Sequence, residues 1–245
     1  MSLQPKPLIN GELIDSGATL ELGGNDADIV LDDVDVEKIA PKIFGSAFAN
    51  CGQVCIALKR VYAHASIYDK LCDALAREAE KAVVGDGLEE GTQIGPIQNA
   101  MQFEKIKGFI AAAKTDGTII AGGEVLNRAG YFVRPTIVRD ISDDSVLVKE
   151  EQFGPILPVL KYDDVDDALA RANNTPYGLG GSVWSSNVDR AYEVAKRIDS
   201  GTAWINLHFA PHVPFGGAKE SGIGVEFAHE GPMEFSQTAV ISIAK

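Results

Sequence analysis

The sequence predicts an α/β fold in which helices cover both faces of a largely parallel, twisted sheet. Two observations support this fold class: amphipathic helical segments and short β-prone runs both occur, and they alternate along the chain. Such alternation is typical of parallel sheets, because each strand needs a crossover before the next. The 245 residues suffice for one sizeable core or two small ones.

Helical periodicity is clearest in two segments. Ser66 precedes apolar residues at helical spacing, and Asp69 completes a Ser-x-x-Asp capping pattern. Ser186 and Asp189 repeat the pattern before a second apolar stripe, which Gly201 is expected to end. Further amphipathic helices are predicted at 36–49, 98–114 and 163–173.

Short runs rich in β-branched and aromatic residues lie between the helices. They predict strands at 60–63, 118–121, 132–138, 156–160, 181–184 and 202–206. Residues 7–15 contain an Asn-Gly turn between apolar pairs, which predicts a hairpin. Residues 235–244 form a late β-prone strand. It is either an edge strand of its own sheet or, as we favour, a strand donated to a second copy of the chain.

Composition excludes several classes of partner. Lys and Arg number 22 against 35 Asp and Glu, a formal charge of −13. Nucleic acids and anionic membranes both require a basic surface, so neither is expected to bind. We find no signal peptide and no apolar run long enough to span a membrane. The odd number of 3 cysteines predicts free thiols in a reducing compartment, taken as the cytoplasm.

Cys55 is the candidate nucleophile. Residues 48–60 read Phe-Ala-Asn-Cys-Gly-Gln-Val-Cys-Ile-Ala-Leu-Lys-Arg. Gly52 permits a bend that turns backbone N–H groups toward the sulfur, and Lys59 and Arg60 add positive charge nearby; a thiolate, rather than a thiol, is the effective nucleophile. We interpret Cys72 as a buried structural cysteine. For Cys51, which shares the loop with Cys55, a structural role and competition with Cys55 both stay open.

Glu21 is the candidate general base. It stands in Leu-Glu-Leu-Gly-Gly, between two apolar residues. An apolar bracket at a strand end suits a carboxylate that accepts a proton from water. A solvated glutamate at a strand terminus is the alternative. His208 and His212 share a short loop, but without a third ligand motif we expect no metal site.

Taken together, these motifs resemble those of the NAD(P)-dependent aldehyde dehydrogenases. The Gly-Gln-x-Cys segment, with Phe-x-Asn before it and Arg after it, is similar to the catalytic-cysteine signature of that family. Leu-Glu-Leu-Gly-Gly is similar to its glutamate signature, in the same order and at about the same spacing. The resemblance implies that Cys55 is the nucleophile and Glu21 the base.

Further segments extend the resemblance to the binding residues. Lys-Glu-Glu-Gln-Phe-Gly-Pro resembles the family's Glu-Glu-x-Phe-Gly-Pro, which implies that Glu151 holds the ribose hydroxyls of the cofactor and that Phe153 packs beside it. The resemblance adds Leu22 to the cofactor contacts. It places the substrate against Phe48, Leu207 and Phe215.

The resemblance also divides the chain. Residues 1–18 correspond to an N-terminal hairpin remnant, 19–234 to the catalytic domain, and 235–245 to an oligomerisation strand that implies a homodimer. Most of the cofactor-binding domain has no counterpart, because no Gly-x-Thr-x-x-Gly turn and no Pro-Trp-Asn segment occur. We hypothesise an internal deletion at Ala18–Thr19, and expect NAD or NADP to bind weakly.

The function implied by the resemblance is oxidation of a small-molecule aldehyde to a carboxylic acid. Cys55 would form a thiohemiacetal and then a thioester, and the activity is expected to be impaired or absent in a truncated chain. Two alternatives stay open. The chain is a non-enzymatic dimerising fragment, or it is a cofactor-free thiol esterase that acts through Cys55.

Overall fold

One sheet of seven strands forms the centre of the molecule. The computed structural model describes residues 8–9, 12–13 and 22–244. The sheet strands are β3 (Ala27–Val30), β4 (Arg60–His64), β5 (Thr118–Ala121), β6 (Thr136–Arg139), β7 (Ile156–Tyr162), β9 (Gly180–Trp184) and β10 (Thr202–Ile205). Their order is β10-β9-β3-β4-β7-β6-β5, and every pairing is parallel except that of β5 with β6. The predicted α/β class with a largely parallel sheet is confirmed.

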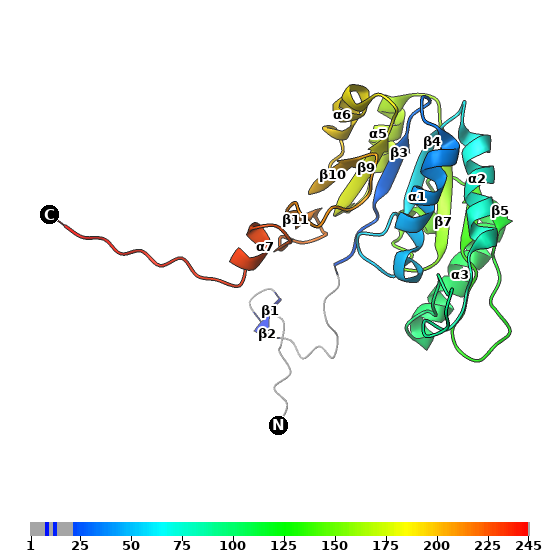
Figure 1. The fold of residues 1–245 in the computed structure, drawn as a ribbon, viewed down its shortest axis with the longest axis horizontal. Helices are drawn as coiled ribbons and strands as arrows, with labels where there is room; N and C mark the ends of the chain where they lie inside the picture. The colour runs from blue at the N-terminus through cyan, green and yellow to red at the C-terminus, as the bar shows by residue number, and fades with distance from the viewer. Residues whose placement is uncertain (1–7, 10–11, 14–21, 245) are drawn as a thin grey trace.

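Helices cover the sheet and connect its strands. Figure 1 shows α1 and α2 in front of the sheet and α5 behind it. The helices are α1 (Val36–Phe48), α2 (Tyr68–Lys81), α3 (Ala100–Asp116), α4 (Val146–Lys149), α5 (Val165–Asn173), α6 (Val188–Ala195) and α7 (Glu230–Met233). A 3₁₀ turn, η1 (Ala49–Gly52), follows α1. Short strand pairs join β1 (Leu8–Ile9) to β2 (Glu12–Leu13), β8 (Tyr177–Gly178) to β12 (Ala218–Lys219), and β11 (Phe215–Gly216) to β13 (Val225–Glu226).

The middle of the sheet is largely apolar, but it buries the polar side chains of Asp28, Arg60 and Ser182. Every residue of β3 and β9 is buried, as expected for strands packed on both faces. Asp28 of β3 is tolerated there because the indole N–H of Trp184 donates to it at 2.8 Å and the Ser182 hydroxyl also donates to it.

Two helix starts differ from their predicted caps. The cap position of α2 is Ile67, and Ser66 instead pairs with the His64 ring at 2.8 Å. The cap of α6 is Asn187, whose side chain accepts from the Arg190 N–H at 3.0 Å. Ser186 donates to the Asp33 carbonyl at 2.7 Å instead. Both predicted capping patterns are therefore wrong, because a local partner, His64, engages Ser66 and a distant one, Asp33, engages Ser186. The helix after Ser186 also ends at Ala195, ahead of the predicted stop at Gly201.

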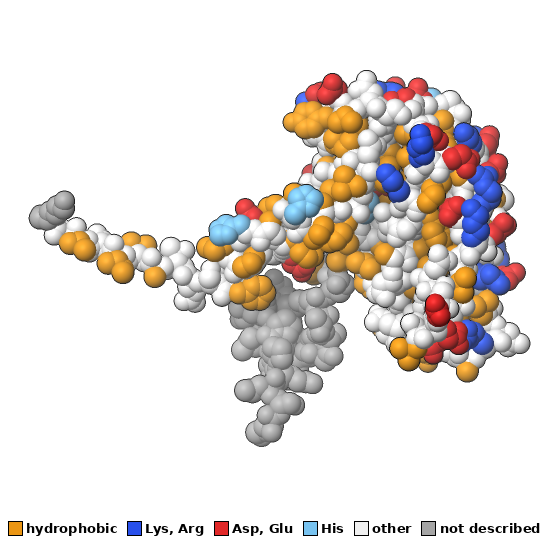
Figure 2. All heavy atoms as spheres, in the orientation of Figure 1, with side chains coloured by type: hydrophobic (Ala, Val, Ile, Leu, Met, Phe, Trp, Pro, Cys, Tyr) orange, Lys and Arg blue, Asp and Glu red, His pale blue; other side chains and the backbone are white. Residues whose placement is uncertain are grey.

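The two ends of the chain lie apart from the sheet. The predicted hairpin is present, since Leu8 pairs with Leu13 and Ile9 with Glu12; its Asn-Gly turn lies outside the described residues. Residues 235–244 have no regular secondary structure and extend away from the body (Figure 1). Figure 2 shows apolar side chains along this tail, and the exposed ones are Phe235, Val240, Ile241 and Ile243. The expected strand is not formed, because no strand of the described residues pairs with the tail.

Candidate active site

A tight turn introduces the loop that carries Cys55. The backbone is left-handed at Asn50 (φ 48°), Cys51 (φ 60°) and Gly52 (φ 70°). A side chain on Gly52 would also collide with the carbonyl of Gly154. This position therefore requires glycine both for its φ and for its space. The turn ends α1 and begins the connection to β4.

Gln53 ties the loop to the neighbouring segment 96–98. Its side-chain N–H donates to the Pro96 carbonyl at 3.2 Å, and its side-chain oxygen accepts from the Gln98 N–H at 2.8 Å. Asn50 in turn donates to the Gln53 carbonyl at 3.1 Å. These bonds give the segment just before Cys55 a defined path, which a preorganised nucleophile requires.

The Lys59 side chain binds the backbone of the Cys55 loop, whereas the Arg60 side chain does not. The Lys59 side chain is buried, and its Nζ donates to the Val54 carbonyl at 2.7 Å and to the Gly52 carbonyl at 3.1 Å. Arg60 instead binds the Asn25 and Ala172 carbonyls. Of the two predicted sources of positive charge, only Lys59 therefore contacts the residue next to Cys55.

His208 contacts the residue on the other side of Cys55. Its Nε2 lies 2.8 Å from the Ile56 carbonyl, and its ring is 3.4 Å from Asp26 and 3.2 Å from Asp28. Asn206 (φ 58°) turns the chain after β10, so that His208 returns to the start of β3. The sequence motifs assigned this histidine no catalytic role, and no local pattern indicated its acidic partners.

The three cysteines have different surroundings. Cys51 and Cys72 are sealed in the core, and burial raises the pKa of each thiol to about 12. Cys55 is partly exposed. Both buried thiols are therefore protonated and unreactive at neutral pH, whereas Cys55 is reachable. The alternative left open for Cys51 is decided in favour of a structural role.

Cys55 separates two pockets. The first has a volume of about 520 Å³, and its lining includes the apolar residues Val54, Ile56, Phe209, Phe215 and Phe227. Besides Cys55, its ionisable members are Lys42, His208 and Glu226. The second, of about 500 Å³, is lined by Leu22, Leu179 and much of the glycine-rich segment 216–224. Cys55 and Phe215 line both. A molecule bound in either pocket would thus lie next to the Cys55 sulfur.

The residues assigned to the cofactor lie around this loop. Leu22 shares the second pocket with Cys55. Glu151 accepts from the Gly24 N–H at 3.0 Å, and Gly24 lies against the Cys55 carbonyl so closely that a Cβ there would be 2.8 Å from it. Phe153 lies 5.4 Å from Lys59 Nζ. Glu21, the assigned base, lies outside the described residues, as does the proposed junction at Ala18–Thr19.

Of the three residues assigned to the substrate, only Phe215 lines the two pockets beside Cys55. Phe48 is only 2% exposed and packs against Phe44 in the core, 4.6 Å between ring centres. Leu207 is exposed, and neither pocket includes it. Phe209 and Phe227, which the motifs did not single out, are in the lining instead.

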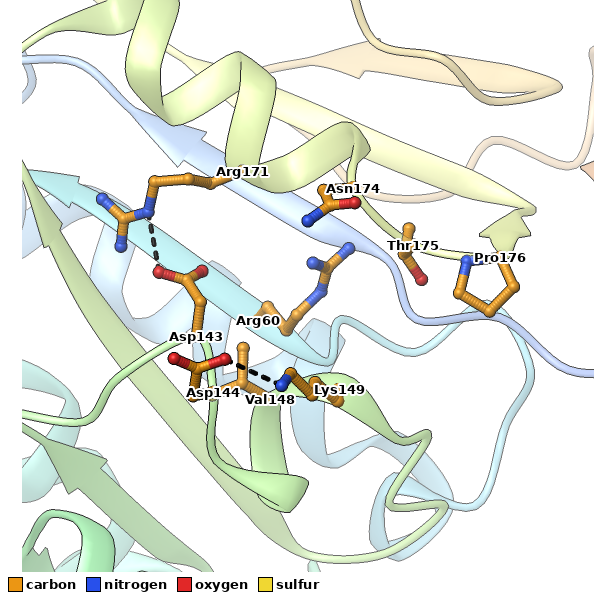
Figure 3. A pocket seen from close by; sticks show the side chains of 9 residues that line it. All are labelled: Arg60, Asp143, Asp144, Val148, Lys149, Arg171, Asn174, Thr175 and Pro176. Carbon is orange, nitrogen blue, oxygen red and sulfur yellow. Dashed lines mark hydrogen bonds and ion pairs between the residues drawn. The ribbon is translucent and has the colours of Figure 1, made fainter.

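A further hollow of about 360 Å³ has no cysteine in its lining (Figure 3). Its charged side chains bind one another or the backbone: Asp143 pairs with Arg171, Asp144 pairs with Lys149, and Arg60 is bound to carbonyls. Saturated ion pairs offer little to a ligand, so we place the candidate active site at Cys55.

This arrangement defines a class of enzyme. A parallel α/β fold that presents a reachable thiol between an apolar pocket and a glycine-lined pocket is suited to nucleophilic attack on a carbonyl group. Comparison with known proteins narrows the class. The family model "Aldehyde dehydrogenase family" matches residues 15–241, so the chain belongs to the aldehyde dehydrogenase family.

Curated relatives and solved structures agree with this assignment. A mitochondrial aldehyde dehydrogenase of Leishmania tarentolae is 40% identical over 86% of this chain and 43% of its own length. A mitochondrial benzaldehyde dehydrogenase of Antirrhinum majus is 40% identical over 85% of this chain and 40% of its own. The NAD⁺ complex of the Bacillus cereus enzyme superposes with a TM-score of 0.82 at 39% identity, covering 86% of this chain and 44% of that one. The chain thus spans less than half the length of these relatives.

Two features are absent from the described residues: a helix that could span a membrane and a cluster of side chains that could bind a metal. No helix in the described ranges is both long and apolar enough to cross a bilayer. Likewise, residues 8–9, 12–13 and 22–244 contain no group of three or more His, Cys, Asp or Glu side chains placed to hold a metal ion.

Proposed function

We propose that the chain is a thiol-bearing part of an NAD(P)-dependent aldehyde dehydrogenase, and that Cys55 is its nucleophile. The observation that carries the proposal is the contrast in exposure: Cys55 opens onto two pockets, while Cys51 and Cys72 are sealed. Family membership supports oxidation of aldehydes as the general reaction.

The chemistry begins with attack of the Cys55 thiolate on the aldehyde carbon. A carbon–sulfur bond forms, the carbonyl π electrons move to oxygen, and a thiohemiacetal results. Loss of hydride from that carbon leaves a thioester on Cys55, and water releases the carboxylic acid with Glu21 accepting the proton. A bound nicotinamide dinucleotide supplies the acceptor for the hydride.

The described residues fit one end of such a cofactor. Leu22 and the glycine-rich segment 216–224 provide a flat pocket wall beside the sulfur. Glu151, which accepts from the Gly24 N–H, is a carboxylate of the kind that can bind a ribose diol. We assign cofactor contact to Leu22, Glu151 and Phe153, and leave open the choice between NAD and NADP.

The apolar pocket favours aldehydes without charge. Three phenylalanine rings meet there, with Phe209 and Phe227 5.5 Å apart and Phe215 and Phe227 6.2 Å apart. Such rings bind flat apolar groups well. A benzaldehyde dehydrogenase and a betaine aldehyde dehydrogenase are both 40% identical to the chain, so the pocket itself carries the choice. We therefore propose benzaldehyde-like substrates over betaine aldehyde, which is cationic.

We expect turnover by this chain alone to be slow. Hydride transfer requires the reacting atoms to be held at about 3–3.5 Å, and the sequence lacks the segments that complete the cofactor cleft in the family it resembles. The Pro-Trp-Asn segment, whose asparagine donates to the oxyanion in that family, is among the missing segments. Loss of one such donor costs about 10²–10³ in rate. Acylation of Cys55 by an activated ester needs no hydride acceptor, so thiol esterase activity is the reaction expected to persist.

The test uses two assays on the same protein. NADH or NADPH formation is followed with benzaldehyde and with betaine aldehyde, and nitrophenol release is followed with p-nitrophenyl acetate. We expect a stoichiometric nitrophenol burst and little reduced cofactor. Cys55→Ala abolishes the burst, while the matched Cys51→Ala variant retains it. A burst that survives Cys55→Ala would overturn the assignment of the nucleophile.

A second candidate function rests on the tail. Phe235, Val240, Ile241 and Ile243 are each more than four-fifths exposed, between 84% and 93%. Such a segment favours pairing with a second copy of the chain, making the fragment an assembly module. Light scattering tests it: we expect a dimer that becomes monomeric when the chain is truncated after Phe235. A monomeric full chain contradicts it.

A further inference from the structure

The loop around Cys55 is held by a basic side chain on each side. Lys59 Nζ donates to the carbonyl of Val54, which precedes Cys55, and His208 Nε2 donates to the carbonyl of Ile56, which follows it. Both basic side chains are buried. Two cations beside one thiol are an arrangement that favours the thiolate.

The surroundings of the His208 ring require a proton on both nitrogens. Nε2 faces the Ile56 carbonyl, which can only accept. Nδ1 lies 3.1 Å from the Ser182 hydroxyl oxygen and 3.2 Å from Asp28. The single Ser182 proton is donated to Asp28, so Ser182 presents a lone pair to the ring. An imidazole with an acceptor at each nitrogen is best matched as imidazolium.

The charges around the ring support the same state. Asp26 Oδ2 lies 3.4 Å from Nε2, close enough for the carboxylate to stabilise a positively charged ring. Burial by itself lowers the pKa of His208, but the bonds and charges of Asp26 and Asp28 outweigh burial and raise that pKa to about 10. The remaining neighbour is the Trp204 ring, 4.9 Å away between ring centres.

We propose that His208 is a positioning residue for Cys55: its Nε2–H fixes the Ile56 carbonyl, and its positive charge favours the thiolate one residue away. The inference rests on the proposed role of Cys55 as nucleophile. The other charged groups near the sulfur are Lys59 beneath the loop and Lys42 and Glu226 in the lining of the first pocket. His208 lines the same pocket and, unlike Lys42 and Glu226, binds the backbone of the loop itself.

The primary experiment measures alkylation of Cys55 by iodoacetamide across pH 5 to 10, with adducts located by peptide mass spectrometry. His208→Gln keeps an N–H donor and removes the charge. We expect its rate at pH 7 to fall about tenfold and the midpoint of its pH–rate profile to rise by about one pH unit. His212→Gln, in the same loop but outside the lining of the first pocket, should match the wild-type protein.

A double variant sharpens the result. His208→Gln alone leaves two carboxylates without the cation, whereas His208→Gln with Asp28→Asn restores the net charge of the wild-type cluster. We expect the double variant to regain most of the lost alkylation rate. A folded His208→Gln protein with an unchanged rate and midpoint overturns the proposal.

The wild-type protein provides a test that does not depend on variant folding. Nitrogen-15 NMR of the histidine rings should show both His208 nitrogens protonated from pH 6 to 9. A neutral ring at pH 7 overturns the proposal. Failure of the proposed function is distinguishable, because in that case wild-type Cys55 would react no faster than a cysteine in a short unstructured peptide.

Discussion

Cys51 and Cys55 share one loop but occupy opposite environments. Cys51 lies in the left-handed turn, 1% exposed, and burial raises the pKa of its thiol to about 12. Cys55 opens onto two pockets, and each neighbouring carbonyl is bound by a buried basic group. Burial makes a thiol inert, whereas access combined with nearby cations makes it reactive. The predictions below are changes that should reduce or sharpen this contrast.

Gly52→Ala should have the largest effect, because Gly52 joins the two environments. Its positive φ and the collision with Gly154 should together cost about 3–5 kcal/mol in the free energy of unfolding. Urea denaturation measures the loss, and the native labelling of Cys55 should fall while that of Cys51 rises. Gly45→Ala in α1 is the matched control, since nothing lies within 4 Å of its new methyl group.

Lys59→Met should weaken one side of the support for Cys55. The change leaves the Val54 and Gly52 carbonyls without their ammonium donor, at a cost of about 2–3 kcal/mol. Iodoacetamide labelling at pH 7 should slow for Cys55 and stay undetectable for Cys51. Unaltered labelling of Cys55 in a folded variant would remove Lys59 from the account.

The free energy of unfolding should depend on pH through the protonation of His208. Its folded pKa of about 10 exceeds the ordinary value near 6.5, so the folded state holds a proton that the unfolded state releases between those values. Its contribution is complete below about pH 6.5 and declines by up to about 1.4 kcal/mol per pH unit toward pH 10. Urea unfolding at pH 6.5, 8 and 9.5 measures the slope. His208→Gln should flatten it, and an equal slope in that variant contradicts the assignment.

Gly45→Ala is expected to give the smallest change. Gly45 lies inside α1 with open space around it, so alanine should stabilise the chain by about 0.5–1 kcal/mol through helix propensity alone. Thermal unfolding measures the gain. A loss of stability there would mean that α1 tolerates less change than its contacts indicate.

Local pattern was enough for most of the sheet. The strands predicted at 60–63, 118–121, 156–160 and 202–206 correspond to β4, β5, β7 and β10 within two residues at each end. The central strand β3 was missed, because Asp26 and Asp28 interrupt its short apolar run. Their partners, His208, Ser182 and Trp184, are distant in sequence, so no local signal could identify them.

For the candidate site too, local motifs predicted some residues and not others. The motifs located Cys55 and the segment of Glu151 and Phe153, which the fold brings to one loop. They did not separate Lys59 from Arg60, adjacent residues whose side chains bind different carbonyls. Phe48 was assigned to the substrate, yet it packs on Phe44 because it faces the core at the end of α1. In each case the direction of the side chain determines what it contacts, and these motifs do not predict that direction.

The most direct test of the account compares three thiols in one molecule. The folded chain is treated briefly with iodoacetamide at pH 7, quenched, and mapped by mass spectrometry, with a urea-unfolded sample as reference. We predict an adduct on Cys55 in the folded chain, and adducts on Cys51 and Cys72 only after unfolding. Protection of Cys55 equal to that of Cys51 in the folded chain would contradict the account.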